Sequence, residues 1–357
     1  MKTQLKTHAF EKRENPMHLD GFEFVEFASP QPEALEQLFK HLGFMPIAQH
    51  KTQDITLYRQ NQINFLLNRT QSSYASDFAQ KHGPCACSMG FRVKDAKFAY
   101  ERALSLGAKS AEAPIAGWYA LYGIGHSLLY FIDRYDDQNS IYDQDFEYFD
   151  NIDKHPKGKG LILIDHLTHN VHRGEMDKWA EFYEKLFNFY EIRYFDIDGK
   201  LTGLTSRALT SPCGKIKIPI NQSKDESSQI EEYLNEYKGE GIQHIALTTN
   251  HIYNTVEGLR KNHVAFLTVP STYYEVIEQR IPGHKEDLAR MRQNQILIDG
   301  SIKNDEGLLL QIFTKNVIGP IFFEIIQRKG NEGFGEGNFT ALFEAIERDQ
   351  VRRGVLK

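Results

Sequence analysis

The feature of this sequence that most restricts its fold is an internal repeat. A strand, a helix and then three short strands recur about four times, grouped in two pairs. Gly21-Phe22-Glu23-Phe24 and its following helix lie in register with Ile164-Asp165-His166-Leu167-Thr168 and its helix, and Leu128–Arg134 aligns with Phe322–Arg328. One helix on a short sheet buries too little apolar surface to be stable alone. The repeat therefore predicts an α+β fold of four βαβββ units, paired into two half-barrels.

Hydrophobic periodicity gives the bounds of the expected elements. Residues 1–18 are expected to form a polar lead-in and residues 133–160 a linker, so that residues 1–150 make one domain and residues 151–357 another. In the first half, strands are expected at 22–28, 55–58, 63–67, 87–93, 119–122 and 127–132, and helices at 34–42 and 96–106. In the second half, strands are expected at 161–171, within 192–220, and at 242–248, 295–299, 308–314 and 322–327, and helices at 176–186, 227–236 and 252–261.

A glycine-rich segment followed by a helix closes the chain. Gly330–Asn338 has four glycines in nine residues, and the helix expected at 339–348 carries Phe339, Leu342, Phe343 and Ile346 on one face. A helix on such a hinge is suited to act as a lid. The alternative is a C-terminal helix that is docked permanently on the body of the protein.

Composition excludes several classes of protein. The net charge of −6 gives no reason to expect nucleic acid as a partner. No run of eighteen apolar residues is present, so no membrane span is expected, and the polar N-terminus lacks the apolar core of a signal peptide. The three cysteines include Cys85-x-Cys87, which matches neither a zinc knuckle nor a redox pair. These features predict a cytoplasmic chain.

Two histidines and one glutamate stand at related places in the repeat. His166 lies in the first expected strand of the second half, His244 in the matching strand of the last unit, and Glu324 in the apolar strand Ile321–Ile326. Two imidazoles and one carboxylate form the facial set of Fe(II) oxygenases, which leaves three metal positions open. The alternatives are structural histidines, since the chain has 14 His, and a salt bridge between Glu324 and Arg328. The matching positions of the first half carry Phe24, the neighbourhood of Gly90, and Tyr130, which are poor metal ligands.

Several separate motifs are similar to those of one family. They are Asp165–Val171, Gly241–Leu247, Leu310–Lys315, Phe322–Arg328 and Gly335–Phe343. With them the chain resembles the 4-hydroxyphenylpyruvate dioxygenase family of the vicinal oxygen chelate superfamily, over residues 10–357. The resemblance implies the vicinal oxygen chelate fold, with a metal-free N-terminal pair of units and a catalytic C-terminal pair. It also implies conversion of 4-hydroxyphenylpyruvate and O₂ to homogentisate and CO₂, a step of tyrosine catabolism.

The same resemblance implies the roles of individual residues. His166, His244 and Glu324 are the expected Fe(II) ligands. Catalytic roles are implied for Gln243, Gln311 and Phe339, and contacts with the substrate for Ser206, Pro219, Asn221, Gln229, Phe313, Phe322, Asn338 and Leu342. The alternative for the apolar members is core packing, and for Gln229 and Gln243 it is exposure as surface amides.

The resemblance also suggests a homo-oligomer, either a dimer or a tetramer, and leaves three rival functions. Hydroxymandelate synthase shares substrate, iron ligands and fold, and only residues of the pocket wall, such as Pro219 and Phe322, favour the dioxygenase. A metal-free small-molecule-binding protein on the same fold is expected to lack a ligand residue, but all three are present. An extradiol ring-cleaving enzyme is disfavoured by the C-terminal glutamine and phenylalanine motifs.

Overall fold

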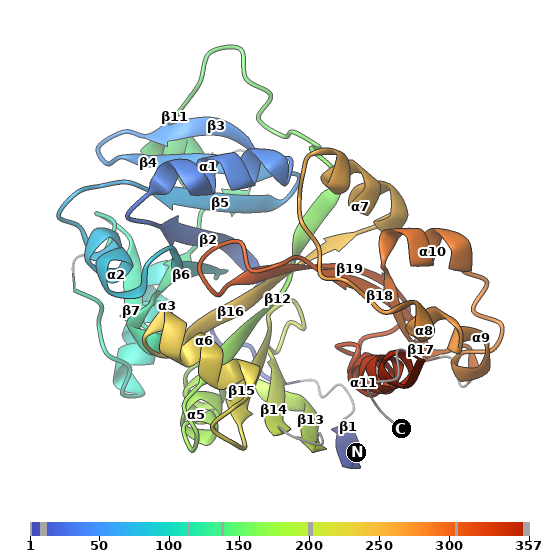
Figure 1. Cartoon of the computed structure of the whole chain (residues 1–357). Coiled ribbons are helices and arrows are strands. Elements are labelled where there is room, and N and C mark those ends of the chain that lie inside the picture. The colour runs from blue at the N-terminus through green and yellow to red at the C-terminus, as the bar shows by residue number, and fades with distance from the viewer. Residues whose placement is uncertain are drawn as a thin grey trace.

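The computed structural model describes residues 2–7, 13–112, 114–136, 139–198, 203–303 and 306–352. It has two large sheets with helices packed on them, and one sheet curls into a half-barrel (Figure 1). The α+β fold class expected from the sequence is confirmed.

The first half of the chain builds an eight-stranded sheet in the order β11-β3-β4-β5-β2-β6-β8-β7. Its central strand β2 pairs in parallel with β5 and antiparallel with β6, and it is buried along its whole length. The strands are β2 (Phe22–Ala28), β3 (Met45–His50), β4 (Ile55–Gln60), β5 (Ile63–Asn68), β6 (Cys85–Arg92), β7 (Tyr119–Tyr122), β8 (Leu128–Ile132) and β11 (Phe146–Tyr148). The helices are α1 (Pro32–His41), α2 (Tyr74–His82), α3 (Ala96–Ser105), the 3₁₀ turn η1 (Ile124–His126) and α4 (Ile141–Asp145).

The second half builds a nine-stranded sheet in the order β1-β13-β14-β15-β12-β16-β19-β18-β17. Its strands are β1 (Lys2–Thr7), β12 (Leu161–Val171), β13 (Tyr190–Asp198), β14 (Gly203–Thr210), β15 (Lys217–Ser223), β16 (Gly241–Thr249), β17 (Leu297–Ser301), β18 (Gly307–Phe313) and β19 (Phe322–Lys329). The helices are α5 (Met176–Phe187), α6 (Gln229–Tyr237), α7 (Ile252–Lys261), α8 (Ser271–Tyr274), α9 (Ile277–Arg280), α10 (Leu288–Asn294) and α11 (Glu336–Arg352).

The repeat is complete in three of its four units. β2-α1-β3-β4-β5, β12-α5-β13-β14-β15 and β16-α7-β17-β18-β19 each follow the expected order. In the second unit, β6-α3-β7-β8, one strand is reduced to an isolated bridge between Ser110 and Leu121. The paired units share edges in the same way: β2 and β6 pair antiparallel, as β12 and β16 do.

Two segments expected to be irregular contain strands. The polar lead-in includes β1, which pairs antiparallel with β13 at the edge of the nine-stranded sheet. The expected linker contains a small β9–β10 ladder (Tyr135–Asp136, Asn139–Ser140), α4, and β11, which pairs with β3. Pairing at a sheet edge satisfies main-chain groups without requiring apolar side chains, so a polar composition did not reveal these strands. A domain boundary near residue 150 stays a prediction.

The two halves share one apolar core. Phe65 of β5 stacks on Phe323 of β19 with ring centroids 5.9 Å apart, and Phe91 of β6 contacts Phe187 at the end of α5 at 5.5 Å. All four rings are fully or almost fully buried. Burial of these rings stabilises the packing of one face of the nine-stranded sheet, which we call the outer face, against the first half. The opposite, inner face is left available for a site.

The C-terminal helix α11 packs through a different face from the one expected. Among the α11 residues whose side chains are described, Asn338, Ala341 and Ala345 are buried, whereas Phe339 and Ile346 are 49% and 45% exposed. The side chain of Phe343 lies outside the described part of the structure. Thr272 of α8 donates a hydrogen bond to the carbonyl of Ala345, so the helix is docked on α8 in this structure. The small side chains of Ala341 and Ala345 allow α11 to approach α8 closely, which the larger side chain of Phe339 would prevent.

Among the described residues, no helix is long and apolar enough to cross a membrane.

Candidate metal centre

Three neighbouring strands bring the two histidines and the glutamate together. β12, β16 and β19 are adjacent, and His166, Ala246 and Glu324 pair across them in one row. His244 precedes Ala246 by two residues, so its side chain is on the same face of the sheet. His166 Nε2 lies 3.3 Å from His244 Nε2 and 3.2 Å from Glu324 Oε2, and His244 Nε2 lies 3.5 Å from the same oxygen.

These distances fit one metal ion. Ligand atoms bound at about 2.1 Å on neighbouring positions of an ion lie roughly 3 Å apart. The three ligand atoms lie within 4.8 Å of one another, and they form the one such His/Cys/Asp/Glu group found among the described residues. Two imidazoles and a carboxylate on one side of an ion suit a divalent transition metal with open positions.

The far side of each imidazole ring is held by a side-chain oxygen. His166 Nδ1 donates to Asp165 Oδ1 at 2.8 Å, and His244 Nδ1 donates to Gln243 Oε1 at 2.6 Å. Such bonds place the ring proton on Nδ1 and leave the Nε2 lone pair facing inward. The hydroxyl of Thr168, 2.9 Å away, also faces His244 Nε2.

The electrostatics of the centre favour an ionised glutamate. Burial opposes ionisation of Glu324, but the adjacent His166 and His244 outweigh it and lower the pKa of Glu324 to about 2. Burial lowers the pKa of His166, but Asp165 and Glu324 beside it outweigh burial and raise that pKa above its ordinary value. Burial lowers the pKa of His244, and the neighbouring charge of His166 lowers it further. A buried carboxylate that stays charged is what a cation site requires.

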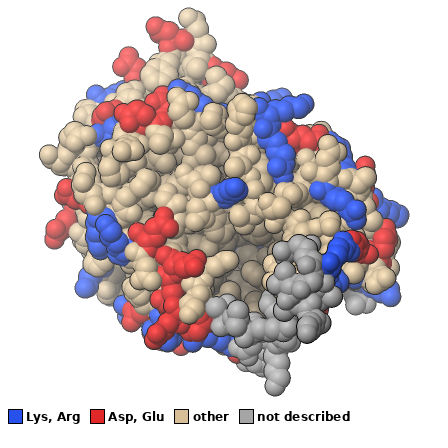
Figure 2. All heavy atoms as spheres, viewed as in Figure 1, with Lys and Arg blue, Asp and Glu red and all other residues tan. Residues whose placement is uncertain are grey.

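Aromatic rings enclose the ligand atoms. Phe322 stacks on His244 with centroids 4.9 Å apart, Phe313 lies 6.5 Å from His244, and the edge of Phe334 meets His166 at 5.2 Å. Figure 2 shows the surface hollowed beside the grey atoms, in the region where Figure 1 places the nine-stranded sheet next to α11. The centre therefore lies on the inner face of the sheet, with apolar walls around polar ligands.

Two family models cover most of the chain. The model described as "Hydroxyphenylpyruvate dioxygenase, HPPD, N-terminal" matches residues 13–147, and that of the "Glyoxalase/Bleomycin resistance protein/Dioxygenase superfamily" matches residues 163–276. The chain is 58% identical to the 4-hydroxyphenylpyruvate dioxygenase of Legionella pneumophila (strain Corby) over 348 residues, which are 96% of this chain and 98% of that protein. The chain belongs to the 4-hydroxyphenylpyruvate dioxygenase family.

Two further proteins are similar. "Hemolysin VllY" of Vibrio vulnificus (strain CMCP6) is 57% identical over 96% of this chain and 98% of its own length. A solved mutant of 4-hydroxymandelate synthase from Streptomyces coelicolor superposes with a TM-score of 0.79 at 25% identity, over 94% of this chain and all of that one. The expectation that the chain is an enzyme of the 4-hydroxyphenylpyruvate dioxygenase family, with the vicinal oxygen chelate fold, is confirmed.

Gln311 and Asn338 extend the hydrogen bonding outward from Glu324. Gln311 of β18 donates to Glu324 Oε1 at 2.8 Å, and Asn338 of α11 donates to Gln311 Oε1 at 2.8 Å. Tyr273 of α8 donates to Asn338 Oδ1 at 2.6 Å. The candidate metal ligand Glu324 is thus connected to the C-terminal helix through the side-chain amide of Gln311.

A row of polar side chains crosses three strands beside the metal centre. Ser206 of β14 pairs with Asn221 of β15, which pairs with Asn170 of β12. Along β12, Thr168 faces His244, and the next residue, His169, contacts Tyr183 of α5 on the opposite face. Asn170 therefore lies on the same face of the sheet as the triad of His166, His244 and Glu324. Asn170 is fully buried, and neither its amide oxygen nor its amide nitrogen has a hydrogen-bond partner among the described residues. A buried amide without a partner is costly and suggests that a ligand completes it.

Three of the expected substrate residues (Pro219, Leu342 and Gln229) and the expected catalytic residue Phe339 are connected to the metal centre less directly. Pro219 pairs with Ala208, which clusters with Phe334. Phe339 is half exposed, and Leu342 is partly buried against the core. Gln229 is exposed at the first position of α6, and no described contact joins it to the triad. The substrate roles of all expected residues stay predictions.

Arg328 pairs with Asp165 and not with Glu324. The salt bridge considered for Glu324 and Arg328 is wrong, because Arg328 forms a two-pronged ion pair with Asp165, at 2.8 and 2.7 Å. Asp165 itself was missed as the residue that holds His166. Its signal was present in the sequence: an acid directly beside a predicted metal histidine is a common orienting partner.

In the first half, aromatic rings stand at two of the three positions that correspond to His166, His244 and Glu324. The row equivalent to His166-Ala246-Glu324 is Phe24-Gly90-Tyr130. By the same register, the counterpart of His244 is Ser88 rather than a residue at Gly90. A Cβ at residue 90 would lie 2.7 Å from the ring of Phe24, so glycine makes room for that ring. The ring centroids of Phe24 and Tyr130 lie 5.8 Å apart. The two rings fill the space that corresponds to the candidate metal centre of the second half.

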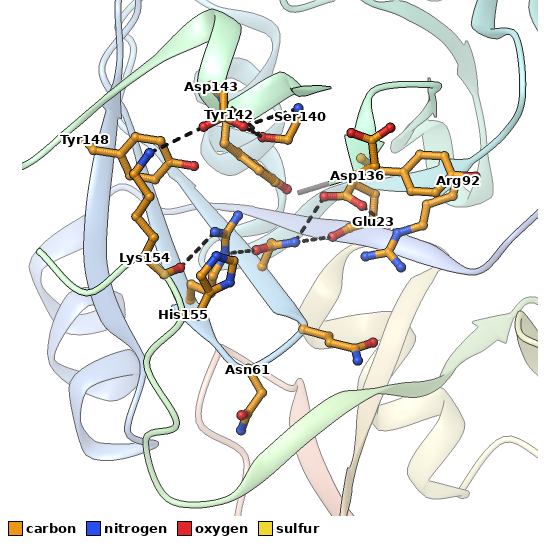
Figure 3. Close-up of a pocket in the computed structure, with 14 residues that line it drawn as sticks. Glu23, Asn61, Arg92, Asp136, Ser140, Tyr142, Asp143, Tyr148, Lys154 and His155 are labelled. Atoms are coloured by element: carbon orange, nitrogen blue, oxygen red, sulfur yellow. Dashed lines mark hydrogen bonds and ion pairs between the residues drawn. The ribbon is translucent and has the colours of Figure 1, made fainter. Parts of the chain in front are cut away.

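A cavity of about 240 Å³ lies in the first half, away from the triad (Figure 3). Glu23 bonds to Arg92 at 2.6 Å and to Asn64 at 3.1 Å, and Arg59 bonds to Asn64 and to the carbonyl of Lys154. The main polar groups of this cavity thus bond to one another, and it brings together none of the expected site residues.

Proposed function

We propose that this chain converts 4-hydroxyphenylpyruvate and O₂ to homogentisate and CO₂, with Fe(II) bound by His166, His244 and Glu324. The observation that carries the proposal is the convergence of these three ligand atoms within 4.8 Å, in a family whose named members include 4-hydroxyphenylpyruvate dioxygenases. Bound Fe(II) supplies the redox chemistry that O₂ requires. The atoms balance: one oxygen of O₂ ends in the new carboxylate and the other in the new ring hydroxyl.

The protein's own groups then have three tasks. Asp165 and Gln243 hold the imidazoles so that both Nε2 atoms face inward. Asn170, Asn221 and Ser206 form a polar row that suits the oxygen atoms of the substrate. We propose that Gln243 and Gln311 lie beside the substrate, and that Gln229 and Asn338 contribute further polar contacts.

Apolar residues keep water from the reacting atoms. We propose that Phe313, Phe322 and Pro219 wall the aromatic ring of the substrate, with Phe339 and Leu342 contributed by α11. Phe322 already stacks on His244, so it is placed to exclude water from that side. Holding the ring within reach of the oxidising centre makes hydroxylation an intramolecular step, and geometry governs the rate of such steps.

The rival product is hydroxymandelate, which the same substrate yields when its benzylic carbon is oxidised. A hydroxymandelate synthase is 25% identical to this chain, whereas the dioxygenase of Legionella pneumophila is 58% identical. The difference supports homogentisate as the product. Assembly into a homo-oligomer and a cytoplasmic location are part of the same proposal and are tested by light scattering and by cell fractionation.

The function is tested by O₂ uptake. Protein loaded anaerobically with Fe(II) and given 4-hydroxyphenylpyruvate is expected to consume O₂ and release CO₂ in equal amounts. His244→Ala should abolish turnover and retain a native circular dichroism spectrum, while the exposed His155→Ala variant should behave as wild type. Absence of turnover in wild-type protein with a full iron complement would contradict the proposal.

A further inference from the structure

Arg328 occupies an unusual place next to the metal centre. It lies on β19 four residues after Glu324, and its side chain is 13% exposed. Nε and Nη2 donate to the two oxygens of Asp165 at 2.8 and 2.7 Å, while Nη1 donates to the carbonyls of Asn331 and Gly333 at 2.9 and 2.7 Å. All three of its nitrogens are therefore engaged, on two different parts of the molecule.

One side of this guanidinium leads to the metal centre. The paired bonds fix the plane of the Asp165 carboxylate, since a guanidinium and a carboxylate match in shape. Oδ1 of that carboxylate accepts the Nδ1 proton of His166, whose Nε2 faces Glu324 and His244. The orientation of His166 thus depends on Arg328 through a single buried residue.

The other side leads to the C-terminal helix. Asn331 and Gly333 belong to the segment that connects β19 with α11. Phe334, the next residue, lies with its ring edge against His166 at 5.2 Å and beneath the Arg328 guanidinium at 5.9 Å. The backbone and the ring of this segment are therefore held by the same two residues, Arg328 and His166.

We propose that Arg328 is a positioning residue that couples metal binding at His166 to the ordering of residues 331–345. A metal ion fixes His166, His166 fixes Asp165, and Asp165 fixes the guanidinium that holds the segment. Coupling of this kind is reciprocal, so an ordered segment in turn strengthens metal binding. The link is separate from the Gln311–Asn338 contact, which joins α11 to Glu324. It rests on the proposed function only in that the triad binds a divalent metal.

The test uses Arg328→Lys in the full-length protein. Lysine keeps the positive charge beside Asp165 but cannot form the fork and reach both carbonyls as well. Co(II) is the probe, because its visible absorption reports binding without O₂ chemistry. We expect the dissociation constant for Co(II) to rise 10- to 100-fold, the usual effect of losing such an outer partner. Asp165→Asn, which removes the charge with little change of shape, should act in the same direction.

The second readout is hydrogen–deuterium exchange. In wild-type protein, Co(II) should slow exchange of residues 331–345, and in Arg328→Lys this Co(II)-dependent protection should be lost. Arg290→Lys is the matched control, because Arg290 forms a similar fork with Glu257 on α7, away from the triad. It should leave both readouts as in wild type, and circular dichroism should confirm that every variant is folded.

Three results would overturn the inference. They are an unchanged Co(II) affinity in Arg328→Lys, weaker affinity with the protection retained, or no Co(II)-dependent protection in wild-type protein. None of these results bears on turnover, so failure of the coupling is distinct from failure of the proposed reaction. Failure of wild-type protein to bind Co(II) would overturn the metal site itself.

Discussion

The side-chain amide of Gln311 donates a 2.8 Å hydrogen bond to Oε1 of Glu324. The other carboxylate oxygen of Glu324, Oε2, is the one that faces both histidines. The amide therefore selects which oxygen is offered to a metal. Because Asn338 of α11 donates a hydrogen bond to the same amide, the C-terminal helix contributes to the geometry of the candidate metal ligand Glu324.

Gln311→Leu tests this relationship. The leucine removes the donor to a buried carboxylate and the acceptor for Asn338, at nearly the same volume. We expect Co(II) affinity to fall 10- to 100-fold, measured by anaerobic titration. Gln327→Leu on β19 is the control, since Gln327 bonds to Asn250 and Ile252 instead. Equal affinities in the two variants would show that Gln311 does not orient Glu324.

Gly335 is the glycine of the C-terminal segment with the least room. A Cβ at this residue would lie 1.6 Å from Gln311 Oε1, and its φ is +78°. Gly335→Ala should therefore displace Gln311 and lower kcat/KM more than tenfold. Gly283→Ala is a matched control, with the same φ and nothing within 4 Å of the new Cβ. That control should cost about 1 kcal/mol of unfolding free energy and leave the kinetics unchanged. Similar kinetics in both variants would contradict the steric argument.

Asn170 should be a residue whose loss harms function but not stability. Its buried amide has no hydrogen-bond partner within the described part of the chain, so replacement by an apolar group of similar shape removes a desolvation cost. Asn170→Leu is expected to keep or raise the unfolding free energy, by up to about 1 kcal/mol, while KM for the substrate rises at least tenfold. The measurements are urea unfolding and steady-state kinetics, with the exposed Asn254→Leu as control. A wild-type KM in Asn170→Leu would remove Asn170 from the substrate site.

His169 predicts a pH dependence of stability. Burial lowers the pKa of His169 to about 3, because its ring is fully buried against Tyr183 of α5. In the unfolded chain, His169 is protonated with an ordinary pKa of about 6.5. Between about pH 6.5 and 3 the unfolded chain therefore binds more protons than the folded chain, so the unfolding free energy falls as the pH falls. From pH 7.5 to 5.5 this residue should account for about 1.4 kcal/mol of lost stability.

The comparison of wild type with His169→Gln isolates that contribution. The variant should lose correspondingly less unfolding free energy over the same pH range, measured by urea titration. The exposed His155→Gln variant should follow wild type. Parallel pH profiles of wild type and His169→Gln would show that His169 is protonated with little cost in the folded protein.

The sequence predicted elements where periodicity and burial agree. The bounds of β7, β12 and α7 match those expected, because each has an apolar pattern of the right period with turn residues at its ends. Helix α2, strand β3 and the short helices α8, α9 and α10 were not anticipated, since they are short and depend on tertiary contacts. β1 was missed because the residues of β13 with which it pairs are 186 to 196 positions away in the chain, from Thr7–Arg193 to Lys2–Asp198.

The candidate metal ligands could be predicted from the sequence, but the residues that support them could not. His166, His244 and Glu324 are marked by residue type, by equivalent places in a repeat and by family motifs. Arg328 lies next to Asp165 only because β12 and β19 both flank β16, a register that spacing along the chain does not reveal. The unpartnered state of Asn170 is likewise a property of packing. Predicting the outer partners of a site therefore requires knowledge of the fold. Its candidate ligands can be predicted from residue type, position in the repeat and family motifs.

The identity of the product distinguishes the proposed dioxygenase reaction from hydroxymandelate synthesis. Homogentisate and 4-hydroxymandelate are isomers, so mass alone does not separate them, but homogentisate keeps three ring protons and hydroxymandelate keeps four. Protein reconstituted anaerobically with Fe(II) should be given 4-hydroxyphenylpyruvate and O₂, and the product identified by retention time and proton NMR. Homogentisate as the main product is the predicted result. Hydroxymandelate would keep the fold and metal site but contradict the assigned reaction, and no product would contradict the catalytic role of the triad.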